Sequence, residues 1–356
     1  MRLLEWPCHP DMKSRKLLWS ALIVLLAGVT VLLAYRHWPA RDSFTGRAEM
    51  LRLMPEDATA VVLVDLAQFR TSSFLAQLFA WAPRPTMEED YAQFVKATGF
   101  NYEKDLDRFA VAFSQQSKEP IRFAIAEGRF ERKKIEQYAE RSGLRISHNG
   151  VVVFSINWKN TARPSFFTFL RDDRIAWTDD PSYAALFQKQ RSAASTAEWA
   201  EHFSRLAGTP IFAVLRQDGS SVASLAQQAP GGFRSPQLAS LVGQLQWITI
   251  GGKPEGDLLR VVIDGECSSE TTIHQLKDFL GGIILLAQAG LNTPDTRKKL
   301  DPQVRDAYLE LLKSAEVESL DRGTSKSVRV IFDVTPKVLQ TARTGNLTRD
   351  PAPAAP

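Results

Sequence analysis

Two stretches of the chain share one pattern: "IRFAIAEGRFERKKIEQYA" (Ile121–Ala139) and "LRVVIDGECSSETTIHQL" (Leu259–Leu276). Each holds an arginine, a short apolar segment, a break at glycine or acidic residues, and then a run with helical spacing. In both stretches an isoleucine follows the arginine by 13 residues. The pattern predicts a strand that leads into an amphipathic helix, at two places in the chain.

The similarity extends toward the N-terminal side of each stretch. "FAVAFSQQSKEPIR" (Phe109–Arg122) matches "WITIGGKPEGDLLR" (Trp247–Arg260) without a gap, at a constant offset of 138 residues. Each reads as two strands joined by a turn that contains proline or glycine. Further upstream, Val61–Leu78 resembles Ile211–Gln228 at an offset of 150 residues, and both segments read as a strand followed by a helix.

A fourth match lies downstream, where "RIAWTDDPSYAALF" (Arg174–Phe187) resembles "RVIFDVTPKVLQTA" (Arg329–Ala342). Because four segments recur in the same order, we expect an internal duplication. The predicted fold class is α+β, with two related, mostly antiparallel β-α-β-β-α-β units over residues 51–190 and 207–342. Hairpins dominate both units, so the helices are expected on one face of the sheets.

Each unit is expected to contain further strands. They fall at residues 151–158 and 165–170 in the first unit, and at 315–321 and 327–334 in the second. The helix of the first stretch is expected to end at Gly143, in the left-handed position that glycine often takes after a helix.

The second unit carries a helical insertion at residues 279–315. "FLGGIILLAQAGL" (Phe279–Leu291) prolongs the second helix, and "DPQVRDAYLELLKSA" (Asp301–Ala315) adds another, with Pro302 at its first helical position. Thirteen residues are too few to span a bilayer. We expect 279–291 to be a buried helix in the seam between the units; the alternative is an exposed apolar face for a partner or the membrane surface.

Charge argues against a nucleic-acid partner. The 356 residues have a formal net charge of +4, and their 44% hydrophobic and 24% charged content is typical of a globular protein. Residues 1–47 hold seven basic and three acidic residues, a balance of +4, so residues 48–356 are neutral overall. A neutral body lacks the charge that holds phosphates.

An apolar run near the N-terminus predicts a membrane anchor. Residues 17–35, "LLWSALIVLLAGVTVLLAY", contain 19 residues without a charge. As a helix this run is about 28 Å long, close to the thickness of the hydrocarbon core. Basic residues in Lys13–Lys16 favour a cytoplasmic segment at 1–16. We predict an uncleaved, single-pass signal anchor in the cytoplasmic (inner) membrane, a spacer at 36–50 and an extracytoplasmic main domain; a cleaved signal peptide is the competing interpretation.

Cys8 and Cys267 lie on opposite sides of this run, so on this topology they cannot form a disulfide. We expect Cys267 to pack near a strand end rather than to act as a nucleophile. The tail at 343–356 is polar and proline-rich, and we expect it to be disordered.

No catalytic or metal-binding signature stands out: HExxH, GxSxG and GxxxxGK[ST] are absent. His148 is expected in a solvated turn. Asp105 and Asp107 suggest a metal site, but Lys104 and Arg108 can neutralise them. We therefore predict no catalytic, cofactor-binding or metal-binding residues and no cofactor.

Two further sets of residues are possible sites. Asp65 ends the first strand, and its match in the second unit is Leu215, so a duplicated catalytic role there lacks support. Trp177 and Trp247 lie in predicted strands and are expected in the core. Trp199 could be exposed, but nothing in the sequence makes it a ligand platform.

Three phrases resemble a group of uncharacterised, membrane-anchored bacterial proteins: "LMPEDATAVVLVDLAQFRTSSFLAQL", "GFNYEKDLDRFAVAF" and "AEGRFERKKIEQYAERSG". The resemblance covers about residues 51–187 and is weaker in the second unit. Proteins of this group carry a D-x-x-x-D-L-D-R type segment; here it reads "NYEKDLDR", without the first aspartate. The group has no assigned activity, so the resemblance implies a bacterial envelope protein and no site residues.

Three functions are compatible with the sequence. The first is a non-enzymatic envelope protein that is held by a single membrane span and binds a protein or another envelope component. The second is a receptor whose ligand site is the seam between the two units. The third is a hydrolase with an active site built from dispersed residues. We expect the first, because the anchor and the duplication are recognisable and catalytic chemistry is not.

Overall fold

The computed structural model describes residues 43–74, 89–114, 121–148, 151–157, 163–180, 196–217, 236–323 and 325–347. The chain divides into two compact units, Met1–Glu49 and Met50–Pro356. Helix α2 (Ser43–Arg52) begins in the first and ends in the second. Within the described ranges, no helix combines the length and apolarity needed to cross a membrane. The predicted anchor at 17–35 lies outside these ranges.

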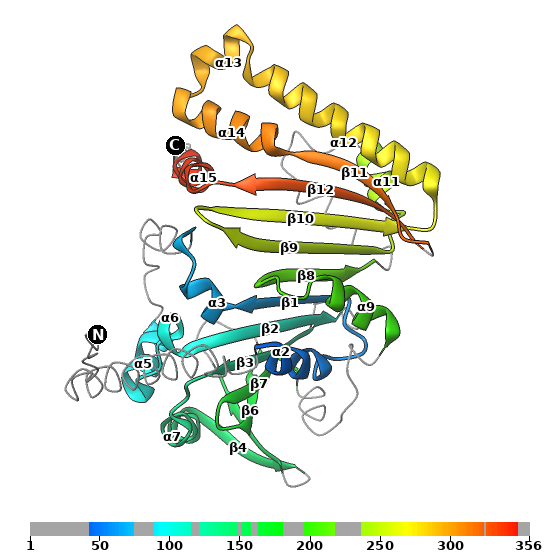
Figure 1. Ribbon diagram of the computed structural model, residues 1–356. Coiled ribbons are helices and arrows are strands. Elements are labelled where there is room, and N and C mark those ends of the chain that lie inside the picture. Colours follow the sequence, from blue (N-terminus) through cyan, green and yellow to red (C-terminus); the bar gives the residue numbers. More distant parts are fainter. Residues whose placement is uncertain are drawn as a thin grey trace, which may run out of the picture. The chain divides into compact units, whose positions relative to one another are not determined.

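From Met50 onward, the described residues are organised around one sheet of 12 strands, in the order β11-β12-β10-β9-β8-β1-β2-β3-β7-β6-β5-β4. All neighbouring strands pair antiparallel. The two predicted units therefore share one sheet, and β1 pairs with β8 at their junction (Figure 1). The predicted α+β class with antiparallel strands is confirmed.

The first half of the sheet is formed by β1 (Ala60–Asp65), β2 (Leu106–Ser114), β3 (Ile121–Gly128), β4 (Gly143–His148), β5 (Val151–Ile156), β6 (Ser165–Arg171) and β7 (Arg174–Thr178). Its helices are α3 (Leu66–Arg70), α5 (Glu89–Thr98), α6 (Tyr102–Asp105) and α7 (Arg132–Ser142).

The second half is formed by β8 (Ile211–Arg216), β9 (Trp247–Glu255), β10 (Leu258–Cys267), β11 (Glu316–Asp321) and β12 (Lys326–Val334). Its helices are α9 (Ala197–Arg205), α11 (Pro236–Val242), α12 (Glu270–Leu291), α13 (Pro294–Lys299), α14 (Pro302–Ser314) and α15 (Pro336–Leu347). The strands predicted at 151–158, 165–170, 315–321 and 327–334 are all present, with ends shifted by one or two residues.

Alternating side chains give the sheet two covered faces. On β1, Val61 and Leu63 point to one face, where they pack with Phe212 of β8 and with Trp199 and Phe203 of α9. We call this side the α9 face. Period-2 alternation along a strand places one set of apolar residues on each face. The main hydrophobic core at the junction of the two halves therefore lies on the α9 face.

The opposite side, which we call the α12 face, is covered by other helices. There α11 and α12 pack on β9 to β12 through residues such as Leu241, Ile273 and Val328. Helix α7 packs on β5 to β7 through Ile135 and Phe154. Helices therefore cover both faces of the sheet, and the expectation of helices on one face is wrong because α9 packs on the other side.

Several details of the predicted helices change in the structure. Gly143 has φ −167°, which is extended backbone, and it begins β4 rather than ending α7 in a left-handed turn. A Cβ at this position would collide with the carbonyl oxygen of Ser155, so close strand packing is the reason for glycine. Helix α15 continues to Leu347, so residues 343–347 are helical rather than disordered. Residues 348–356 lie outside the described ranges.

The helices predicted within residues 279–315 are present. Residues 279–291 form the C-terminal part of the single helix α12, and Asp301 caps α14 with Pro302 at its first turn. The helix does not lie at the seam, since α12 packs on β10, β11 and β12 in the second half. Leu285 is 67% exposed and Leu286 is 75% exposed, so the expectation of a buried helix is wrong for this part of α12.

The gapless sequence match between the two hairpins does not hold residue by residue. Phe109 is 36% exposed on the α12 face, whereas its match Trp247 is 8% exposed in the core of the α9 face. Side chains alternate between faces, so a register error of one residue inverts every side chain of a strand. An offset of 138 therefore pairs residues that point in opposite directions.

Four charged side chains cross the first half on the α9 face, and we call them the charge ladder: Asp65, Arg108, Glu127 and Arg174. Each lies directly opposite the next in the register of β1, β2, β3 and β7. Arg108 Nε lies 3.1 Å from Asp65 Oδ2, and Arg108 Nη1 lies 2.8 Å from Glu127 Oε2. Arg174 Nε donates to Glu127 Oε1 at 2.7 Å.

The charge ladder fixes strand register because three of its four members are buried. Asp65 is 2%, Arg174 is 4% and Glu127 is 6% exposed. A shift of one strand by one residue would leave buried charges without partners, which is strongly unfavourable. Asp65 also caps α3, since its Oδ1 accepts a hydrogen bond from Gln68 N at 3.0 Å.

We predict that Glu127→Gln destabilises the fold by about 3 kcal/mol, because Arg108 and Arg174 would lose the buried carboxylate between them. The free energy of unfolding is measured by urea denaturation. Glu131→Gln is the matched control, since the Glu131 side chain is 72% exposed and its contact with Lys134 spans 4.0 Å. Equal effects of the two substitutions would contradict the role given to the charge ladder.

Candidate functional site

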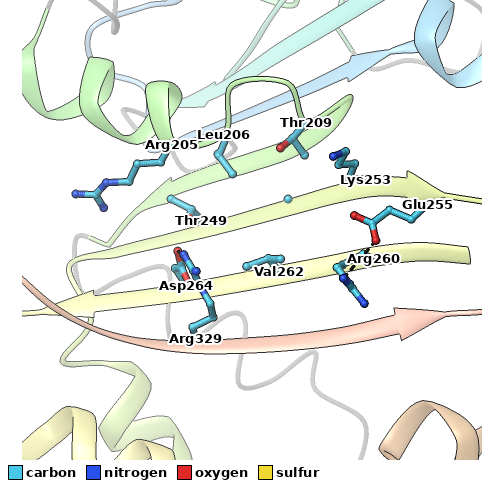
Figure 2. A pocket seen from close by; sticks show the side chains of 11 residues that line it. Arg205, Leu206, Thr209, Thr249, Lys253, Glu255, Arg260, Val262, Asp264 and Arg329 are labelled. Carbon is cyan, nitrogen blue, oxygen red and sulfur yellow. Dashed lines mark hydrogen bonds and ion pairs between the residues drawn. The ribbon is translucent and has the colours of Figure 1, made fainter. Parts of the chain in front are cut away.

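A cavity of about 250 Å³ opens on the α9 face of the second half. We call it the basin. Strands β9, β10 and β12 form its floor, and the segment that leads from α9 to β8 forms one wall (Figure 2). Its lining comprises Arg205, Leu206, Thr209, Thr249, Gly251, Lys253, Glu255, Arg260, Val262, Asp264 and Arg329.

A glycine on β9 lets the wall approach the floor. A Cβ at Gly251 would lie 3.1 Å from Leu206 Cδ2 and 3.2 Å from Thr209 Cγ2. The next residue, Gly252, faces the other side of the sheet, where a Cβ would meet Leu259 at an ordinary 3.6 Å. Because Gly251 has no side chain, the wall can lie close to the floor at this position, and this contact sets the shape of the basin.

Asp264 and Arg329 form one end of the basin. Arg329 donates to Asp264 from Nε at 2.8 Å and from Nη2 at 3.0 Å, a bidentate pair. Arg322 Nη2 adds a third hydrogen bond at 2.7 Å. Burial disfavours the charged form of Asp264, but Arg329 and Arg322 outweigh burial, so the pKa of Asp264 is lowered. The carboxylate is held ionised and is unsuited to act as a general acid.

Glu266 lies behind this end, beneath α9. It pairs with Arg205, and Nε2 of His202 lies 3.4 Å from its Oε2. Burial opposes its ionisation, but His202 and the arginines outweigh that effect and lower the pKa of Glu266. The His202 ring stacks on Trp247 with centroids 4.2 Å apart. Glu266 thus links α9 to the sheet, and it does not line the basin.

The other end of the basin contains Arg260, Glu255 and Lys253. Arg260 Nε donates to Asp333 Oδ1 at 3.0 Å, and its Nη1 lies 3.3 Å from Glu255 Oε2. Lys253 is exposed, and no carboxylate of the described chain forms an ion pair with it. The centre between the two charged ends is formed by small and apolar groups, with Val262 on the floor (Figure 2).

Lys253 also lines a second cavity, of about 440 Å³. This cavity contains Gln68, Thr71, Ser72 and Ser73 from the first half, and Gly208, Pro210, Pro254 and Gly256 from the second. Ser73 Oγ donates to Gly256 O at 2.7 Å, which links the halves across it. The second cavity therefore lies at the seam, next to the basin.

The chemistry of the basin favours binding. Each arginine and carboxylate in its described lining is engaged in an ion pair, and its only hydroxyl groups belong to Thr209 and Thr249. A nucleophile with an adjacent base is therefore missing from that lining. Among the described residues, no group of three or more His, Cys, Asp or Glu side chains is placed to hold a metal ion.

The candidate residues of the sequence analysis lie apart from the basin. Cys267 ends β10 and is 2% exposed, as expected, and burial raises the pKa of its thiol. His148 is the last residue of β4 rather than part of a turn. Asp65 belongs to the charge ladder. Trp199, which could have been exposed, is 0% exposed.

Asp105 and Asp107 do carry neutralising partners, but not those expected. Arg129 lies 3.6 Å from both carboxylates, and Arg70 pairs with Asp107. Arg108 points to the other face of β2, where it joins the charge ladder. The alternation of side chains along the strand separates Arg108 from its neighbour Asp107.

The basin itself is not among the sites expected from the sequence. Its signal was present in "LRVVIDGEC", where charged residues at even spacing, Arg260, Asp264 and Glu266, share one face of a strand. Arg329 sits at the position directly opposite Asp264, which only the β10–β12 register reveals.

Comparisons with known proteins give no family. No family model matches the chain, and no curated protein matches it. Among solved structures, crystal form III of TP0453 is 7% identical with a TM-score of 0.47, over 83% of this chain and 97% of that chain. Crystal form IV of TP0453 is 8% identical with a TM-score of 0.45, over 85% of this chain and 99% of that chain.

We predict that Asp264→Asn lowers the free energy of unfolding at neutral pH by about 2–3 kcal/mol, because Arg329 and Arg322 lose a buried anion. Since the folded-state pKa of Asp264 lies below the ordinary 3.8, its contribution is present above that value and is lost as pH falls through the folded-state pKa. The variant should therefore lose less stability on acidification than the parent, as measured by urea denaturation at a series of pH values.

Asp172→Asn serves as the control, because the Asp172 side chain is 87% exposed in a surface ion pair with Arg132. If Asp264→Asn and Asp172→Asn give the same stability and the same acid dependence, the described role of Asp264 is wrong.

Proposed function

We propose that the protein is a non-enzymatic binding module of the bacterial cell envelope, held by a single membrane span at residues 17–35 with its main domain outside the cytoplasm. The apolar run of 19 residues and the basic residues before it support the anchor. The resemblance of residues 51–187 to membrane-anchored bacterial proteins supports a location in the bacterial cell envelope.

The basin is the observation that carries the binding role. Its arginines and carboxylates neutralise one another, so they hold a fixed shape, and the described lining pairs no nucleophile with a base. Lys253 is the exposed cation at its rim, shared with the second cavity. A protein or envelope component with an acidic group fits this rim, with an apolar part over Val262.

The two halves derive, in this proposal, from an internal duplication. Both halves continue outward from the β1–β8 junction through a hairpin to a fourth strand. In each half, an acidic residue on the third strand faces an arginine directly opposite on the fourth: Glu127 with Arg174, and Asp264 with Arg329. If these two pairs are equivalent, residues of the two third strands correspond at an offset of 137. The gapless sequence match of the hairpins has an offset of 138, one residue more.

The second cavity supports the alternative of a receptor with its ligand site at the seam. It draws polar groups from both halves, and Ser72 Oγ is buried there without a hydrogen-bond partner. A buried hydroxyl of this kind is a suitable donor or acceptor for a small polar ligand. A hydrolase would need a nucleophile and a base, which the described lining of the basin does not offer.

One experiment tests both the membrane placement of the main domain and the basin rim as the binding site. The full chain is produced in a bacterial envelope, membranes are washed with alkaline carbonate, and protease is added to spheroplasts. Partners are then captured by cross-linking from native membranes, with Lys253→Glu beside Lys133→Glu. Both lysines are exposed, and Lys133 lies on α7, away from the basin.

We expect the chain to resist carbonate, its main domain to be cleaved by external protease, and Lys253→Glu alone to reduce capture several-fold. Release by carbonate, or protection from the protease, would show that the placement is wrong. Equal capture by the two charge-reversal variants would show that the basin rim is not the binding site.

A further inference from the structure

Helix α12 has two parts with different surroundings. In its N-terminal part, Thr272, Ile273 and Leu276 are buried against the α12 face of the sheet. In its C-terminal part, residues 279–291, two large apolar side chains are mostly exposed: Leu285 at 67% and Leu286 at 75%. We call this part the α12 tip. It lies beside α13 and α14, beyond the strands that bury the first part (Figure 1).

The α12 tip is apolar around much of its circumference, yet packing covers only part of it. It contains no charged residue, and its one amide side chain, Gln288, already donates to Leu312 O at 2.8 Å. A helix with this composition is usually buried in a core or in lipid. Leu285 and Leu286 are consecutive and so point about 100° apart, which leaves a broad apolar surface in water.

The groups beside the α12 tip indicate which partner covers it. Helix α13 carries three basic residues, Arg297, Lys298 and Lys299, against Asp295, a balance of +2. Arg297 and Lys298 are exposed, and no carboxylate of the described chain forms an ion pair with either. An aliphatic surface bordered by free cations matches a layer of acyl chains beneath anionic headgroups.

A protein partner fits this surface less well. Protein interfaces rely on aromatic and arginine anchors and on about one hydrogen bond per 100–200 Å². The α12 tip after Phe279 offers leucine, isoleucine, alanine and glycine, and its amide is already occupied. Thirteen residues of helix, about 20 Å, are too short to cross a bilayer and suit a position along its surface.

We infer that the α12 tip and α13 form a second membrane contact, which rests on the surface of a bilayer that contains anionic phospholipid. The inference rests on the proposed anchor at 17–35, which would keep lipid at a high effective concentration near the folded domain. The contact would restrain the domain on the membrane and thereby limit the directions from which the basin can be reached.

The test places a nitroxide on the α12 tip of the full chain. Leu285→Cys is made with Cys8→Ser, and Cys267 is left because it is 2% exposed. The labelled chain is reconstituted into vesicles of phosphatidylcholine alone or of phosphatidylcholine with phosphatidylglycerol. Collision rates of the nitroxide with oxygen, which partitions into lipid, and with a water-soluble nickel chelate are then compared. Lys133→Cys on α7 is the matched control site.

We expect the ratio of oxygen to nickel collisions at position 285 to rise several-fold in the phosphatidylglycerol vesicles and to stay low at position 133. Arg297→Glu with Lys298→Glu should bring the ratio at 285 back toward that of phosphatidylcholine alone. Leu286→Cys provides a second label site, so a local effect of one substitution cannot decide the result.

Three results would overturn the inference. The first is equal, water-like ratios at 285 and 133. The second is the same ratio at 285 in both lipids. The third is spin–spin broadening that disappears on dilution with unlabelled chain, which would identify a second copy as the partner. Carbonate resistance of the same vesicles reports on the anchor separately, so a water-exposed tip on a carbonate-resistant chain contradicts this inference alone.

Discussion

The pairing of β1 with β8 is the constraint on which the rest of the structure depends. Val61 and Leu63 lie opposite Val214 and Phe212, and the α9 face of this junction is the main core. Because the two strands are antiparallel and hydrogen-bonded, two halves that could have been separate domains become one sheet. The junction also places α9 over β9. Helix α9 supplies Arg205, and the segment that follows α9 forms one wall of the basin.

Buried charge pairs then set how the remaining strands align. The charge ladder crosses the first half, and Asp264 lies directly opposite Arg329 in the second. Such pairs contribute less to stability than an apolar core, but a misaligned strand would bury them unpaired. In the second half the same kind of pair lies at the rim of a cavity. The constraint that fixes strand register therefore also shapes the candidate site.

Much of the fold could be predicted from the sequence, because strands and helices follow local periodicity. The hairpin at Trp247–Arg260 and the helix that begins at Pro302 needed only neighbouring residues. It was harder to predict which face of the sheet each side chain points to, since a one-residue error in alignment moves every side chain of a strand to the opposite face. Only the charged face of β10 has a signal in the sequence; the basin as a whole could not be predicted, because α9, β9, β10 and β12 meet there through long-range pairing. The α12 tip was expected to be buried because its composition resembles that of a core helix.

Amide hydrogen exchange across the junction tests the central claim most directly. Asp65 N donates to Pro210 O at 2.7 Å, and Arg216 N donates to Thr59 O at 2.8 Å, so the ladder between them joins the halves. If the sheet is one cooperative body, the amides of Leu63 and Phe212 exchange only through global unfolding, with the free energy found by denaturation. Exchange of these amides through a lower-energy opening, while β3 and β10 stay protected, would mean that the halves separate and that the account is wrong.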